Sequence, residues 1–213
     1  MLVRDGKRGR EVLLGRRRKT ARFLPGIWVF PGGRLDPEDA LPSGFEERFG
    51  ALPAGLDGAT QAKGAALLRA AIRETFEETG VLIGQPGRPA GPAAERPVWK
   101  HYADAGILPA FELPRLLARA ITPTNSPIRF HTRFFLADVT GRHHGEPRDD
   151  ELEEVAWILL KETPSLEMVD VTEFVLAQAL RGAAPAAPLF SYRGDAVRPD
   201  LKDVMATLGP RGG

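Results

Sequence analysis

The chain has 213 residues, 43% of them apolar, and a formal net charge of +1, so it can bury a sizeable core but offers no global field for nucleic acid or membranes. It contains no cysteine, which excludes disulfides, thiolate catalysis and cysteine–zinc sites. No apolar run approaches the length of about 18 residues that spans a membrane, and the N-terminus lacks the apolar core of a signal peptide, so a cytoplasmic location is expected.

The first part of the chain is predicted to form short strands separated by turns. Residues 2–4 and 11–14 are predicted as a strand–turn–strand pair, and residues 27–30 as a short apolar strand that stops at Pro31-Gly32-Gly33. Two glycines after a proline make a tight turn that allows close backbone approach. A basic run at residues 16–19 follows the second strand and is either a solvated strand end or a phosphate contact.

The rest of the chain alternates helices, strands and loops. Helical spacing predicts helices over residues 60–79, 99–105, 111–121 and 168–180. Strands are predicted at 128–137 and 155–160, and loops at 84–97 and 141–150. No linker or internal repeat interrupts this order, which favours a single α/β domain.

Three glutamates share one face of the helix predicted over residues 60–79. Glu74, Glu77 and Glu78 are spaced i, i+3 and i+4, so they project from the same side. The opposite face is apolar and carries Leu68, Ile72 and Phe76. A divalent cation would remove the repulsion among the three charges, and carboxylate oxygens suit Mg²⁺ or Mn²⁺.

Two neighbouring residues support this helix. Arg73 lies one turn before Glu77, so it can pair with that carboxylate and fix its rotamer. Gly80 stands where a helix commonly ends on a glycine.

Together, these residues resemble the Nudix box of the Nudix hydrolases. The likeness rests on Pro31-Gly32-Gly33, an acidic loop, and Arg73-Glu74-x-x-Glu77-Glu78-x-Gly80-Val81, and it extends over roughly residues 1–180. The resemblance implies a three-layer α/β/α sandwich with a mixed sheet, in which the box forms a loop, a helix and a loop. It also implies Mg²⁺- or Mn²⁺-dependent hydrolysis of a nucleoside diphosphate linked to another group.

The box departs from the family pattern in its length. In the usual box five residues separate a glycine from an acid, which would be Asp39 counted from Gly33 and Glu38 counted from Gly32. Residues 40–72 then separate Asp39 from Arg73, 33 residues where the usual box has seven, so about 26 are inserted. Such an insertion is similar to that of the subgroup containing the peroxisomal coenzyme A diphosphatases of animals.

The resemblance and the charge pattern assign roles to individual residues. The predicted metal ligands are Glu74, Glu77, Glu78 and, through its carbonyl, Gly33. The predicted catalytic residues are Arg73, Glu77, Glu78 and, as general base chosen from Glu151, Glu153 and Glu154, Glu153. The predicted phosphate-binding residues are Arg17, Arg34, Arg129 and Arg133. The expected division is a Nudix domain over 1–182, with the insert at about 40–62, and a Pro/Gly-rich extension over 183–213 that packs on the domain or is partly mobile.

Several functions remain open at this point. The subgroup likeness favours coenzyme A or an acyl derivative as substrate, with ADP-ribose, another nucleotide sugar or a dinucleotide as alternatives. A non-catalytic nucleotide-binding regulatory module on the same fold is an alternative of another class. The expected partner is a small-molecule nucleotide, with neither nucleic acid nor membrane, and the family also allows a homodimer.

Overall fold

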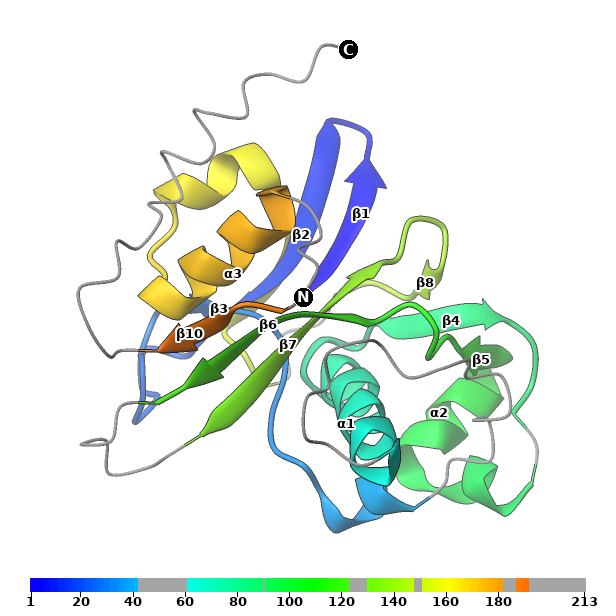
Figure 1. Cartoon of the computed structure of the whole chain (residues 1–213). Coiled ribbons are helices and arrows are strands. Elements are labelled where there is room, and N and C mark those ends of the chain that lie inside the picture. Colours follow the sequence, from blue (N-terminus) through cyan, green and yellow to red (C-terminus); the bar gives the residue numbers. More distant parts are fainter. Residues whose placement is uncertain (42–60, 90, 123–129, 148–150, 182–186, 192–213) are drawn as a thin grey trace.

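The computed structural model describes residues 1–41, 61–89, 91–122, 130–147, 151–181 and 187–191 (Figure 1). Most of the expected insert at about 40–62 and of the expected extension at 183–213 therefore lies outside the described residues. In the part described, no helix is both long enough and apolar enough to cross a membrane.

A mixed seven-stranded sheet forms the centre of the fold (Figure 1). Its strands lie in the order β10-β6-β7-β1-β2-β3, and β9 also pairs with β2. The β1–β7 and β10–β6 pairs are parallel, and the other pairs are antiparallel. The strands are β1 (Leu2–Gly6), β2 (Gly9–Arg16), β3 (Trp28–Val29), β6 (Arg115–Ile121), β7 (His131–Asp138), β9 (Glu154–Leu159) and β10 (Leu189–Ser191).

Smaller elements complete the structure around this sheet. The helices are α1 (Gln61–Thr79), α2 (Pro97–Ala105) and α3 (Asp170–Arg181), and the 3-10 turns are η1 (Pro37–Ala40), η3 (Pro92–Glu95) and η4 (Leu160–Ser165). A second, three-stranded antiparallel sheet consists of β5 (Ile107–Pro109), β4 (Leu82–Pro86) and β8 (His143–His144), in that order.

Strand β2 shows that the central sheet is covered on both faces. Val12, Leu13 and Leu14 are consecutive in sequence, and all three are fully buried. Val12 and Leu14 pack in a cluster with Val175 of α3, whereas Leu13 packs with Val81 at the end of α1. Figure 1 shows α3 on one side of the sheet and α1 on the other. The fold is therefore the α/β sandwich expected from the sequence.

The prediction of a helix at 111–121 is wrong, because Arg115–Ile121 form strand β6. The helix was predicted because Leu113, Leu116, Leu117 and Ala120 recur at helical spacing. In the structure Leu116 packs with Leu68 of α1, while Leu117 packs in the cluster on the α3 side. A strand buried on both faces forms a continuous apolar run, which spacing alone does not distinguish from a buried helix.

Two of the predicted loops also contain strand residues. The segment 84–97 begins inside β4 and includes η3, and the segment 141–150 contains β8. β4 pairs with both β5 and β8. A two-residue strand such as β8 has no periodicity to detect, so only its pairing with β4 reveals it. The other predicted helices and strands are confirmed, with ends that differ by up to three residues.

Candidate functional site

Helix α1 presents its acidic face because its apolar face is fixed in the core. Leu68 and Ile72 are fully buried, and the ring of Phe76 lies 6.3 Å from that of buried Tyr102 on α2. Gly80 ends the helix with a φ of 72°, and its N–H donates to the Phe76 carbonyl at 2.7 Å. The carboxylates of the last two turns therefore stand on a rigid element.

The glycine turn after β3 lies against two of these carboxylates. The Gly32 N–H donates to Glu78 Oε2 at 2.9 Å, and Gly32 adopts a φ of 151° that favours glycine. A Cβ atom on Gly33 would lie 2.4 Å from the Glu74 carboxyl group. A side chain at Gly33 would have to displace the Glu74 carboxyl group, so the glycine lets the backbone approach Glu74 closely.

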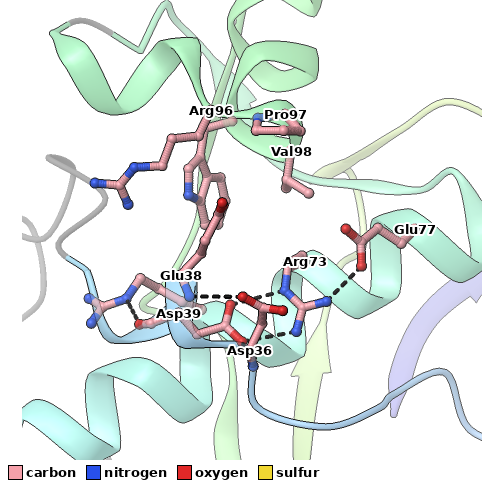
Figure 2. Close-up of a pocket in the computed structure, with 10 residues that line it drawn as sticks. Asp36, Glu38, Asp39, Arg73, Glu77, Arg96, Pro97 and Val98 are labelled. Atoms are coloured by element: carbon pink, nitrogen blue, oxygen red, sulfur yellow. Dashed lines mark hydrogen bonds and ion pairs between the residues drawn. The ribbon is translucent and has the colours of Figure 1, made fainter.

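Arg73 joins the loop half of the box to the helix half (Figure 2). Its Nε and one terminal nitrogen donate to the two carboxylate oxygens of Asp39 at 3.0 and 2.9 Å. Its other terminal nitrogen lies 2.6 Å from Glu77 and 2.9 Å from Glu74. The hydrogen bond to Asp39 is the main cause that raises the pKa of Arg73. The predicted Arg73–Glu77 pair is present, and it is one part of a larger network.

Asp39, rather than Glu38, occupies the place opposite Arg73. The Asp39 side chain is only 3% exposed and accepts from the Asp36 N–H at 2.8 Å, while its carbonyl accepts from Arg69 Nε at 2.6 Å. Glu38 is exposed, and its N–H donates to the carboxylate of Asp36, the N-cap residue, at 2.8 Å. The insertion thus leaves the two halves of the box in contact.

The carboxylates near the glycine turn are partly desolvated, and this burial opposes their ionisation. Burial raises the pKa of Glu78 to about 7, although the Gly32 N–H opposes this shift. The charges of Glu74 and Glu151 raise the pKa of Glu78 further, and the charge of Arg17 lowers it. Burial also raises the pKa of Glu74, with Arg73 opposing it. A bound cation would stabilise the ionised form of both groups.

The donor set fits a hard divalent cation. Glu74, Glu77 and Glu78 supply carboxylate oxygens, and the Gly33 carbonyl belongs to a turn that contacts Glu74. Glu74 and Glu78 lie beside the turn, whereas Glu77 is exposed and held by Arg73. Within the described residues, no three acidic or histidine side chains already stand in a metal-holding arrangement. Two of the four predicted ligands, Glu74 and Glu78, are thus close neighbours of the glycine turn.

Glu151 is linked to the site more directly than the predicted base Glu153. Its charge acts on Glu78, and its carbonyl accepts from Arg18 Nε at 3.3 Å. Glu153 instead lies 3.7 Å from Arg16, and one of its carboxylate oxygens is buried without a hydrogen bond. The sequence named this acidic segment but held no signal for which of its acids acts electrostatically on Glu78.

The predicted phosphate-binding arginines are spread around the box. Arg17 lies within electrostatic range of Glu78. Arg34 lies over the Phe130 ring at 5.1 Å. Arg133 is on β7, and its Nε is buried without a hydrogen bond. Arg129 lies outside the described residues. The structure thus brings Arg17 to the acidic face, and it places Arg34 on the loop between the glycine turn and η1.

A cavity of about 170 Å³ adjoins Arg73 on the side of η1 and α2 (Figure 2). Glu77 is the only predicted metal ligand among the residues that line it. The lining residues are Asp36, Glu38, Asp39, Arg69, Arg73, Glu77, Arg96, Pro97, Val98 and Trp99. Trp99 is 5% exposed, and its ring packs 5.5 Å from that of Phe111, so it is a core residue rather than a base-stacking one.

Comparison with known proteins agrees with this geometry. Residues 1–178 match the model of the NUDIX domain. A Caenorhabditis elegans protein provisionally named nudix hydrolase 7 is 30% identical over an alignment of 167 residues, and the match covers 73% of this chain and 49% of that protein. The chain thus spans about half the length of this curated relative.

A solved structure with clear sequence similarity shows the same fold. The crystal structure of a NUDIX hydrolase from Alicyclobacillus acidocaldarius is 34% identical, with a TM-score of 0.59 over 82% of this chain and 86% of that chain. The NUDIX domain of Shewanella oneidensis NrtR, crystallised with ADP-ribose, covers 84% of this chain and 82% of its own at 14% identity. Its TM-score of 0.49 is too low to support an argument. On the family match, the chain belongs to the Nudix family.

Proposed function

We propose that this protein hydrolyses a diphosphate linkage in a nucleoside diphosphate derivative, with Mg²⁺ or Mn²⁺ as cofactor. The observation that carries the proposal is the approach of Glu74 and Glu78 to the Gly32–Gly33 turn, which gathers oxygen donors at the end of a rigid helix. The names of the two relatives, both Nudix hydrolases, support the reaction class.

The metal would be held by Glu74, Glu77, Glu78 and the Gly33 carbonyl. When bound, it would neutralise phosphate charge and lower the pKa of a bound water. The chain's own residues supply the remaining requirements. Arg73 holds η1 through Asp39 and the residue after the glycine turn through the Arg34 carbonyl, so that this loop stays against the helix. Arg17 and Arg34 are cations on the two loops that flank the glycine turn, and they would bind the phosphates of the substrate.

Glu151 is the residue that we propose as general base, in place of Glu153. A base has to lie within hydrogen-bond reach of the water it activates, directly or through one further water. The charge of Glu151 acts on Glu78, which supports the choice of Glu151 for a base on the same side of the site. Glu153 is tied to Arg16 instead.

Coenzyme A or acyl-coenzyme A is the proposed substrate, because the split box resembles the subgroup that cleaves it. ADP-ribose, another nucleotide sugar or a dinucleotide is the alternative within the same chemistry. A non-catalytic nucleotide-binding module is the alternative of another class, and the presence of Arg73 and all three glutamates speaks against it. A cytoplasmic location and a homodimer remain predictions.

A hydrolysis panel tests this proposal. The purified chain is incubated with Mg²⁺ or Mn²⁺ and with coenzyme A, ADP-ribose, NADH or diadenosine polyphosphates, and the products are identified by mass. The expected result is metal-dependent cleavage of one class into two phosphorylated products, lost in Glu78→Gln. No turnover on any of them, with nucleotide binding retained, would favour the regulatory module.

A further inference from the structure

The β2–β3 loop, residues 17–27, lies beside the glutamates and the glycine turn without being part of either. At one end it leaves β2, where the Arg17 N–H donates to the Ile27 carbonyl at 3.0 Å. At its other end β3 leads within four residues from Trp28 to Gly32, whose N–H holds Glu78. The loop is thus continuous with the glycine turn.

Two side chains tie this loop to the reaction centre. The guanidinium of Arg17 lies in electrostatic range of Glu78, and its Nε donates to the Phe23 carbonyl at 2.8 Å. Arg18 Nε donates to the carbonyl of Glu151 at 3.3 Å. Arg17 therefore holds the backbone at Phe23 by a hydrogen bond, while its charge acts on Glu78 of the predicted metal site.

Phe23 stands out among the aromatic residues near the site because its ring is solvent-exposed. It is 67% exposed, the largest value among the exposed large apolar residues of the described chain. The other aromatic rings that could stack on a base are buried or lie against an arginine. Trp28 is buried, Arg4 lies over Trp157 at 4.2 Å, and Arg34 lies over Phe130. Within the described residues, no ring or cation contact to Phe23 occurs.

The backbone holds Phe23 in this exposed position at a conformational cost. Leu24 has a φ of 51° and is the one residue other than glycine with a positive φ in the part described. A bulky residue seldom adopts this region, and such strain persists where surrounding contacts enforce it, commonly at ligand sites. Here the Gly26 N–H, donating to the Arg17 carbonyl at 3.1 Å, helps to close the loop.

We infer that the β2–β3 loop is the base-binding element of the site, with the ring of Phe23 stacking on the planar base of a nucleotide. This inference rests on the proposed function, and it adds how the nucleotide part of the substrate is recognised. The cations of the loop and its exposed ring match the two chemical parts of a nucleotide, its phosphates and its base. Stacking accepts every base because each has a π-face.

The test compares two probes that differ only in the base, AMP and ribose 5-phosphate. Their binding to the intact chain is measured by calorimetry in Mg²⁺. The wild type is expected to bind AMP more tightly than ribose 5-phosphate. Phe23→Ala should weaken AMP binding by roughly five- to 150-fold, the fold-change equivalent of losing one stacked base, and leave ribose 5-phosphate unchanged. Phe23→Trp should restore AMP binding, and Phe23→Leu should not.

Leu189→Ala is the matched control, because Leu189 is an exposed apolar residue, 46% exposed, on β10 at the opposite edge of the sheet. It should leave the binding of both probes unchanged. Equal binding of the two probes by the wild type would overturn the inference, as would an equal loss of both probes in Phe23→Ala. A changed oligomeric state in Phe23→Ala with both probes equally affected would assign Phe23 to an interface instead.

These outcomes are separable from those of the hydrolysis panel. If no substrate is cleaved but AMP is preferred through Phe23, the proposed reaction fails and the base-binding loop stands. If a substrate is cleaved and Phe23→Ala has the wild-type KM for it, the base-binding role of the loop is contradicted and the proposed reaction is supported.

Discussion

Two arginine–glutamate networks of this protein are built in the same way but differ in their charge balance. In the first, Arg73 pairs with Glu74, and a Cβ on Gly33 would lie 2.4 Å from the Glu74 carboxyl. In the second, Arg4 pairs with Glu11 at 2.7 Å, and a Cβ on Gly6 would lie 2.4 Å from the Glu11 carboxyl. Each network therefore places a glycine backbone against a glutamate that an arginine holds.

The two arginines differ in the number of carboxylates that surround them. Arg4 also contacts His143 Nε2 at 3.0 Å and lies over Trp157, so this arginine faces one carboxylate and two aromatic rings. Arg73 faces Asp39, Glu74 and Glu77, and Glu78 stands nearby without a salt bridge in the described structure. The balanced network is structural, and the network with excess negative charge is the one suited to a cation.

Glu78→Gln should have the largest effect. Removing one key electrostatic group at a reaction centre costs about 3–4 kcal/mol of transition-state stabilisation, so kcat/KM should fall by roughly 10²–10³. The metal-free protein should remain folded. Burial disfavours the charged form of Glu78, and glutamine has nearly the same shape but carries no charge. Steady-state kinetics and thermal unfolding measure both effects. Activity close to that of the wild type would contradict the assignment of Glu78.

Asp39→Ala should break the connection between the two halves of the box. It leaves Arg73, whose side chain is 14% exposed, without its bidentate partner. Arg73 keeps its contacts with Glu74 and Glu77, so the loss should be that of the hydrogen bonds to Asp39, about 1–3 kcal/mol. Glu38→Ala is the matched control and should change the free energy of unfolding by less than about 0.5 kcal/mol. Urea denaturation would show equal losses for both variants if the pairing of Asp39 were unimportant.

Gly33→Ala and Gly6→Ala compare the two networks directly. Each added methyl group displaces a glutamate, Glu74 in one case and Glu11 in the other. Gly33→Ala should lower kcat/KM by about tenfold, since misplaced reacting groups lower the rate. Gly6→Ala should lower only the unfolding temperature. The comparison fails if Gly6→Ala reduces kcat/KM as much as Gly33→Ala does.

Glu11→Gln should have the smallest effect. The glutamine can still accept a hydrogen bond from Arg4, so the loss in unfolding free energy should be about 1 kcal/mol. Chemical denaturation measures this loss, and kcat/KM should be unchanged. A fall in kcat/KM without a loss of stability would mean that the second network also serves the reaction.

The sequence predicted the acidic helix well because its determinants are local. Leu68, Ile72, Glu74 and Glu78 define two faces of α1 through helical spacing, and Gly80 marks its end. The counted spacing, by contrast, left Glu38 and Asp39 equivalent. Only the fold buries Asp39 against Arg73, across a separation of 34 positions.

Other features depended on contacts that spacing does not encode. Strand β6 was predicted as a helix because its apolar residues recur at helical spacing. That spacing arises here because Leu116 and Leu117 are buried on opposite faces of the sheet. The acidic segment that contains Glu151 and Glu153 has no periodicity that distinguishes its members, and the electrostatic effect of Glu151 on Glu78 depends on the tertiary structure. The predicted roles of the arginines and glutamates remain predictions until they are measured.

The most direct test of the central claim is metal binding by the two networks. Mn²⁺ or Mg²⁺ is titrated into the wild type, Glu78→Gln and Glu11→Gln, and unfolding is followed at each concentration. The wild type and Glu11→Gln should both be stabilised by about 2.7 kcal/mol when the metal is at 100 times its Kd, and Glu78→Gln should show little stabilisation at the same concentration. Equal stabilisation of all three proteins would contradict a metal site at Glu78.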